Sequence, residues 1–360
     1  MAKAEFHEKP YDEGTLSKLD VFELYIREWI PVFLSEEDPR FREIHIFDFF
    51  SGPGSDPDGI LGSPLRILKE LRSYYDQGLK GWGKVKIVAH FFDQDSAKID
   101  SLSLKINNPL CQTPGVEIDL QILPFRQALE SYRNILENPG LPKLLIIDQF
   151  GVDEVSDEVF KFLIKLSRTD FLFFIASSTL HRFRDHPAIK QKIAEPEDSY
   201  AVHRMVFDYY KKIIPSTRDV FLGQFSIRKR SNIYGLIFGS SHPLGIKKFL
   251  DVCWNRDRRF GEANFDIERD SIHPDELLLN LDEMRPNKVR NFEIELEKNI
   301  VSGSLVFEGD LIRFCFEYGM TLRHSSLVLK KLKKQGVIDI DFRIPDISKI
   351  KHSRRIRIKT

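Results

Sequence analysis

The chain has 360 residues with 54 basic and 54 acidic side chains, so its net charge of +0 excludes a global attraction to polyanions. Its length allows two domains, and its 42% hydrophobic content supports a sizeable core. The three cysteines lie far apart, so we expect neither a metal site nor a disulfide framework. No apolar run is long enough for a signal segment or a membrane span, so we expect a soluble, cytoplasmic protein with no membrane partner.

Residues 16–33 carry apolar side chains at helical spacing, which predicts an N-terminal helix capped by Thr15 or Ser17. Five strand-like runs then alternate with four helix-like runs. This alternation predicts an α/β fold with a doubly wound, mostly parallel sheet, whose functional loops lie at the carboxyl ends of the strands. The predicted strands are 45–50, 85–92, 116–123, 143–148 and 171–176, and the predicted helices are 63–75, 95–106, 125–136 and 157–168.

The rest of the chain divides into three predicted regions. Polar helices at 186–194 and 199–213 precede an antiparallel hairpin of 221–230 and 233–241 and a helix at 243–254, which complete an α/β domain over 1–255. Residues 256–300 form a charged connector with helical stretches at 276–284 and 292–300. In 301–360, two helices (309–319 and 321–336) precede two strands (337–344 and 354–359), which is the order of a winged-helix domain.

The first predicted strand leads into a glycine turn of the form D-x-F-x-G-x-G, made by Asp48, Phe50, Gly52 and Gly54. A dinucleotide loop would need a third glycine where this chain has Pro57. The pattern resembles the cofactor loop of methyltransferases that use S-adenosylmethionine (SAM). A carboxylate is favourable near the cationic methionine part of SAM, so we assign these four residues to SAM binding. The alternative is a tight turn after a buried strand.

Two further strand ends fit the same cofactor. The second strand ends at Asp93, where an acidic side chain in nucleoside-binding sheets accepts hydrogen bonds from the ribose hydroxyls. The spacing from Gly54 is longer than usual, and the neighbouring Asp95 could simply cap the next helix. Phe125 follows the third strand, where side chains often flank adenine, although Phe125 could equally belong to the core.

The fourth strand ends in Asp148-Gln149-Phe150-Gly151, at the position where amino-group methyltransferases carry motifs like D-P-P-Y. In such motifs an oxygen accepts hydrogen bonds from the target amine and orients its lone pair toward the methyl group, while an aromatic ring stacks on a flat substrate. We assign these two catalytic roles to Asp148 and Phe150. The alternative is a polar strand end that only closes the site.

The C-terminal region is strongly basic, with twelve Lys or Arg and three acidic residues in 321–360. A basic second helix and a basic wing suit contacts with nucleic-acid phosphates and a groove. A winged helix used for protein contact is the alternative. The predicted nucleic-acid contacts are Arg323, Lys330, Lys331, Lys334, Arg354 and Arg355.

Several segments together resemble the family of three-Cys-motif partner proteins (TcmP). They include the N-terminal helix with Lys18, Tyr25 and Trp29, and three stretches that read FDFFSGPG…DGILGSPL, IIDQFG and SSHPLGIKKFLDVCWNRDRRFGEANFDI. The resemblance implies a Rossmann-like methyltransferase fold with SAM at the glycine turn, and a separate three-Cys-motif protein, related to radical-SAM proteins, as a partner. The family tends to have D-P-F-G where this chain has D-Q-F-G.

These observations predict a SAM-dependent methyltransferase that acts on nucleic acid at a base amine. An inactive methyltransferase-like partner that binds nucleic acid is the alternative, suggested by the missing proline at Gln149. A nuclease is a third hypothesis, which would need Asp56, Asp58, Asp93 and Asp148 to converge on a metal.

Overall fold

A computed structural model of the chain describes residues 10–109, 111–148, 155–175, 202–229, 232–259, 261, 287–350 and 354–359. Contacts divide the chain into two compact units, of which the first comprises Met1–Val220 with Ser226–Gly245. The second comprises Phe221–Phe225 with Ile246–Thr360. The domain boundaries at residues 255 and 300 remain sequence-based predictions.

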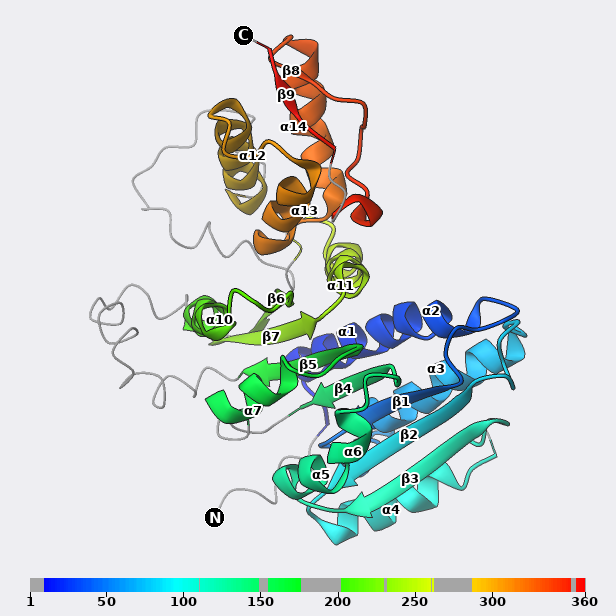
Figure 1. Cartoon of the computed structure of the whole chain (residues 1–360). Coiled ribbons are helices and arrows are strands. Elements are labelled where there is room, and N and C mark those ends of the chain that lie inside the picture. The colour runs from blue at the N-terminus through cyan, green and yellow to red at the C-terminus, as the bar shows by residue number, and fades with distance from the viewer. Residues whose placement is uncertain are drawn as a thin grey trace. The chain divides into compact units, whose positions relative to one another are not determined.

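A seven-stranded sheet has the order β3-β2-β1-β4-β5-β7-β6 (Figure 1). The pairs β1–β2, β1–β4, β2–β3 and β4–β5 are parallel, whereas β7 runs antiparallel to β5. This mixed, Rossmann-like sheet confirms the predicted α/β class. The strands are β1 (Glu43–Asp48), β2 (Lys86–Asp93), β3 (Val116–Ile122), β4 (Lys143–Ile147), β5 (Thr169–Ile175), β6 (Phe221–Lys229) and β7 (Asn232–Ser240).

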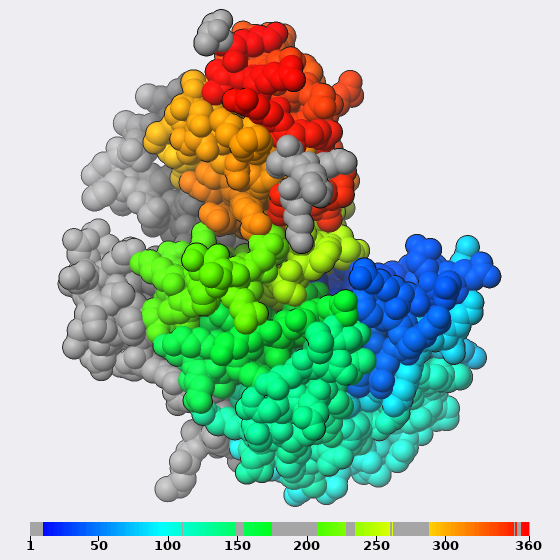
Figure 2. Space-filling view, viewed as in Figure 1, coloured from blue at the N-terminus to red at the C-terminus, as the bar shows by residue number. Residues whose placement is uncertain are grey.

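Central strands of this sheet read as nearly continuous apolar runs because helices cover both of their faces. Every residue of β4 is buried, as are five of the six in β1. Helices α5, α6 and α7 cover one face, and α1, α3 and α4 lie on the other (Figure 1). In the space-filling view, a segment coloured teal to green, the colours of α5–α7, lies on the near surface (Figure 2). These helices are α1 (Glu13–Trp29), α3 (Ser63–Asp76), α4 (Ser96–Ile106), α5 (Phe125–Ser131), α6 (Arg133–Leu136) and α7 (Asp157–Leu163).

Two helix predictions differ from the structure in detail. The N-terminal helix is capped by Asp12, whose carboxylate accepts a hydrogen bond from the Thr15 N–H, so the predicted caps Thr15 and Ser17 were wrong. The helix predicted over 125–136 is interrupted at Tyr132, whose ring packs edge-on against Phe47 and Phe92. A short helix, α2 (Pro31–Leu34), follows α1 directly.

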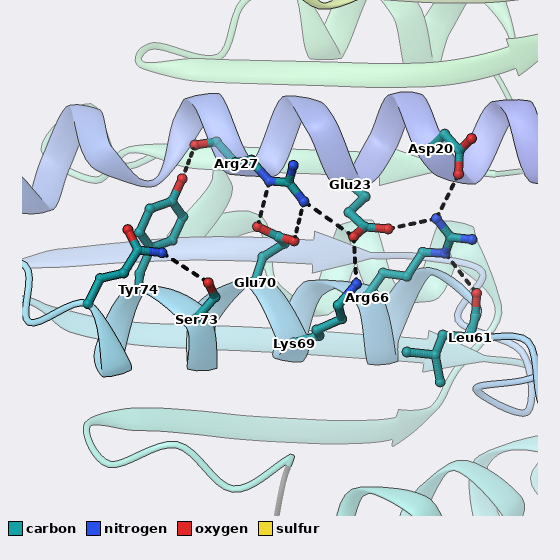
Figure 3. Close-up of polar contacts among 10 residues, drawn as sticks. Asp20, Glu23, Arg27, Leu61, Arg66, Lys69, Glu70, Ser73 and Tyr74 are labelled. Carbon is teal, nitrogen blue, oxygen red and sulfur yellow. Dashed lines mark hydrogen bonds and ion pairs between the residues drawn. The ribbon is translucent and has the colours of Figure 1, made fainter. Parts of the chain in front are cut away.

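Helix α1 is attached to α3 by a continuous network of charges (Figure 3). Arg27 donates two hydrogen bonds to the buried carboxylate of Glu70, at 3.0 and 2.8 Å. Arg66 donates to Glu23 at 2.7 Å and also to the Leu61 carbonyl at 2.8 Å. Because Leu61 lies two residues before the start of α3, this network attaches the N-terminal helix to the end of the glycine-rich loop.

Two further helices correspond to sequence predictions, α10 in the first unit and α12 in the second. Helix α10 (Val202–Ile213) matches the second of the predicted polar helices, while the one predicted at 186–194 lies outside the described residues. The Tyr210 hydroxyl of α10 donates to the Val155 carbonyl at 2.7 Å, just before α7. Helix α12 (Asn287–Val301) contains the helical stretch predicted at 292–300 of the connector.

The second unit continues with α13 (Glu308–Glu317), α14 (Leu322–Lys334) and an antiparallel pair of short strands, β8 (Ile338–Asp339) and β9 (Arg357–Ile358). A further bridge joins Phe307 to Arg355. This is the order of elements predicted from the sequence. The unit also contains α11 (Pro243–Arg256) over most of its length and the 3-10 turn Ile347–Lys349.

Among the helices of the described residues, none is both long and apolar enough to cross a membrane.

Candidate functional site at the carboxyl edge of the sheet

The glycine turn after β1 adopts backbone conformations that side chains rarely tolerate. Gly52 and Gly54 have φ angles of 61° and 86°, in the left-handed region that favours glycine. A Cβ atom placed on Gly54 would lie 2.8 Å from Leu102 Cδ1 of α4. The left-handed conformation therefore favours glycine at both positions, and the close packing against Leu102 favours it further at Gly54.

The loop beyond Gly54 closes on itself. The Gly62 N–H donates to the Gly54 carbonyl at 2.7 Å, and a bridge joins Ser55 to Leu61. The buried carboxylate of Asp56 accepts hydrogen bonds from the Ile60 and Tyr11 N–H groups, both at 2.8 Å. Asp56 thus holds the loop and the segment before α1 together, which is a structural role.

Asp48 at the end of β1 is fully buried and incompletely bonded. Its Oδ1 accepts the Phe50 N–H at 3.2 Å, while its Oδ2 is a buried oxygen without a hydrogen-bond partner in the described residues. Burial, with smaller contributions from the Asp148 and Asp93 carboxylates, raises the pKa of Asp48 to about 7, although the Ser63 hydroxyl and the Phe50 N–H act in the opposite direction. An unsatisfied buried carboxylate is costly, so it points to a cationic or donor group that completes the site.

Asp93 at the end of β2 lies against the same turn. Its Oδ2 accepts the Gly52 N–H at 3.2 Å and its Oδ1 accepts the Asp95 N–H at 3.0 Å. Lys98 Nζ lies 3.9 Å from Oδ2. Asp95 also caps α4 by accepting the Ala97 N–H, as the sequence suggested. Asp93 therefore connects the second strand end to the glycine turn and occupies the position expected of a ribose ligand.

Three phenylalanines form an aromatic cluster beside the turn. Phe125 at the start of α5 is buried, with its ring centre 5.2 Å from Phe49 and 5.4 Å from Phe50. Phe50 is only half-buried. The structure therefore supports the alternative that Phe125 belongs to the hydrophobic core. Phe50, in contrast, retains an exposed surface on which a flat ring could pack.

Asp148, which follows β4, is bound by a lysine from the N-terminal helix. Lys18 Nζ lies 2.7 Å from Oδ1 and 2.6 Å from Oδ2, so one ammonium group spans both carboxylate oxygens. The two side chains are 8% and 14% exposed. The same ammonium lies 4.8 Å from the ring centre of Phe174 on β5. Phe150 and Gln149 lie outside the described residues.

Tyr11 completes the edge on the N-terminal side. Burial raises the pKa of the Tyr11 phenol to about 12, and the nearby Asp56, Asp148 and Asp48 carboxylates add to this effect. These influences place Tyr11, Asp48 and Asp148 around one region. The sequence pattern gave no signal for Tyr11, and Lys18 drew attention only through the family resemblance.

The carboxylates of this edge do not form a metal site. Among the described residues, no group of three or more His, Cys, Asp or Glu side chains is arranged to hold a metal ion. Asp58 is exposed, and Asp56 is bonded to backbone N–H groups of its own loop and its neighbour. The nuclease hypothesis therefore gains no support from these residues.

The predicted nucleic-acid contacts fall into two groups. Arg323, Lys330, Lys331 and Lys334 are exposed on α14, opposite its buried residues, although Lys331 also pairs with Glu297 at 2.7 Å. Arg354 instead donates two hydrogen bonds of 2.6 Å to the buried Glu308, and its guanidinium lies over the Phe342 ring. Arg354 thus holds the fold together, whereas the neighbouring Arg355 is exposed.

Comparisons with known proteins find structural likeness only. No protein-family model matches the chain, and no curated protein matches it. The O-methyltransferase TomG from Streptomyces achromogenes, solved in complex with SAM, is 13% identical, and the match covers 64% of this chain and 89% of that one with a TM-score of 0.34. A spermidine synthase, solved with the transition-state analogue AdoDATO, is 14% identical over 66% of this chain and 63% of that one, with a TM-score of 0.31. Likeness at this level carries no argument about activity.

Proposed function

We propose that the chain is a SAM-dependent methyltransferase that acts on nucleic acid. One observation carries the cofactor assignment: the buried Asp48 carboxylate, with one oxygen without a hydrogen-bond partner among the described residues, lies beside a turn whose glycines have left-handed backbone conformations. SAM is a cation, and it supplies an electrophilic methyl group when bound. An acidic, partly unsatisfied edge favours such a ligand over an anionic dinucleotide.

The chain's own residues have separable roles in this proposal. Asp48 lies near the methionine part of the cofactor, Asp93 accepts the ribose hydroxyls, and Gly52 and Gly54 leave room for close approach. Phe50 packs against the adenine. Asp148, at the end of β4, accepts a proton or a hydrogen bond from the acceptor group.

Nucleic acid as the substrate is supported by the exposed basic face of α14. Lys330 follows Arg323 by seven residues and Lys334 follows Lys330 by four, so all three lie on one face of α14, and all are exposed. We propose that the C-terminal elements form a winged helix whose second helix contacts the polymer. The exposed Arg355 next to β9 would contribute from the wing.

The alternative is a catalytically inactive partner of a three-Cys-motif protein, as the TcmP resemblance implies. The fully paired Asp148 gives this alternative a structural basis, because Lys18 already occupies both of its oxygens. Transfer of tritiated methyl groups from SAM to pooled DNA and RNA separates the two functions. Activity that Asp148→Ala abolishes would exclude the inactive partner, and no transfer despite SAM binding would favour it.

A further inference from the structure

Helix α14 carries an exposed leucine in the middle of its basic face. Leu327 is 59% exposed, and the buried residues of α14 lie on the opposite side of the helix. Arg323 precedes Leu327 by four residues, while Lys330 and Lys334 follow it by three and seven. Because these spacings follow the turns of an α-helix, the leucine and the three cations share one exposed face.

The surroundings of Leu327 indicate the kind of ligand that this face fits. A single exposed leucine is ordinary on a protein surface, so its exposure alone indicates no ligand. Helix α14, however, contains no acidic side chain, and the cations around the leucine repel one another until an anionic ligand lies against them. The face therefore fits a ligand that carries negative charges along its length and an apolar group between them.

The spacing of the cations matches a groove of duplex DNA. Arg323 and Lys334 are eleven residues apart in α14, which is about 16 Å along the helix axis at about 1.5 Å per residue. The major groove of B-DNA is about 12 Å wide and admits an α-helix. The two cations can thus reach phosphates on both sides of the groove while Leu327, between them, faces the edges of the bases.

Leucine can contact only an apolar group on those base edges. In the major groove, adenine, guanine and cytosine present hydrogen-bond donors and acceptors, whereas thymine also presents its C5-methyl group. We propose that α14 enters the major groove of duplex DNA and that Leu327 contacts the methyl group of a thymine there. The inference rests on the proposed function and deepens it, because it names the polymer and one feature of its sequence.

Two properties of RNA disfavour it as the partner of this face. An A-form RNA helix has a deep, narrow major groove that side chains cannot read. Uracil, which replaces thymine in RNA, also lacks the C5-methyl group that Leu327 would contact. The width of the groove and the methyl group therefore both favour DNA.

Two DNA duplexes that differ only in this methyl group test the contact. The full-length protein is titrated with a short fluorescent duplex of alternating dA and dT, and with the same duplex carrying dU in place of dT. Phosphates and base pairing are the same in both duplexes. We expect the thymine duplex to bind about three- to fivefold more tightly, as the burial of one methyl group predicts. Equal affinity for the two duplexes would overturn the proposal.

Variants assign the preference to the leucine. Leu327→Ala should bind the two duplexes with equal affinity, whereas Lys330→Gln should weaken both alike and reduce the salt dependence of binding by about one ion. The matched control is Leu104→Ala, which removes a leucine of α4 that is 77% exposed and should keep the preference of the wild type. A thymine preference that persists in Leu327→Ala would contradict the contact.

The inference and the proposed function fail in different ways. Tighter binding to an RNA duplex of alternating rA and rU than to either DNA duplex would overturn the thymine contact and leave a nucleic-acid methyltransferase. No binding to any of the three duplexes would overturn the contact together with the nucleic-acid substrate, and it would favour a protein partner with an acidic, partly apolar helix. A thymine preference without SAM binding would support the contact and contradict the methyltransferase.

Discussion

The α1–α3 interface and the carboxyl edge of the sheet are both rich in buried charge, but they satisfy that charge differently. At the interface, Glu70 is 4% exposed and accepts two hydrogen bonds from Arg27, and Glu23 is bonded to Arg66 and Lys69. At the edge, Asp48 is fully buried with Oδ2 unbonded. Paired buried charges keep a fold in register, whereas an unpaired one has a cost that folding alone does not offset.

The two regions also differ in how their surroundings shift the pKa values of their charged groups. The partners at the interface also lower the pKa of Glu23 and raise that of Arg27, so both charged forms are favoured. The environment of Asp48 does the opposite and disfavours its charge. Shifts that disfavour the charged form of a group at a strand end are typical of functional sites.

The largest effect should appear in the pH dependence of stability. Asp48 has a pKa of about 7 in the folded protein against 3.8 ordinarily, so the folded state binds more protons between these values. Its contribution therefore destabilises the fold as pH rises from about 4 to about 7, by up to about 4 kcal/mol at about 1.4 kcal/mol per pKa unit. Asp48→Asn should be more stable than the wild type above pH 7 and should lose this advantage near pH 4.

Urea unfolding of both proteins across this range measures that difference. Burial also lowers the pKa of His45 to about 3, which makes the fold more stable as pH rises toward 6.5. This second effect is common to both proteins and cancels in their difference. A difference that stays constant from pH 4 to pH 8 would show that Asp48 is not destabilised by burial.

A smaller effect is expected at the interface. Glu70→Gln removes the charge that holds Arg27, and we expect a loss of about 1–3 kcal/mol in unfolding free energy with SAM affinity unchanged. Lys69→Gln, on the exposed side of the same network, should cost less than about 1 kcal/mol. For both variants, urea unfolding measures the free energy of unfolding and titration with SAM measures the affinity. A large loss of SAM affinity in Glu70→Gln without a loss of stability would contradict the separation of the two regions.

The alternation of apolar runs predicted the strands and most helices because burial on both faces of a parallel sheet leaves a strong pattern. It also predicted the residues at the ends of β1, β2 and β4, since a strand end is visible in sequence. It did not predict that Lys18 meets Asp148, because a contact across 130 positions depends on how α1 crosses the sheet. Nor did it distinguish Arg354, held by Glu308, from the exposed Arg355 beside it.

Calorimetric titration with SAM tests the central claim most directly. Gly54→Val places a branched side chain at a φ of 86° and against Leu102, and Asp93→Ala removes the carboxylate at the ribose position. We expect the wild type and Lys69→Gln to bind SAM alike, Gly54→Val to lose binding and Asp93→Ala to bind about tenfold or more weakly. No binding by the wild type, or equal binding by all four proteins, would contradict a SAM site at the carboxyl edge.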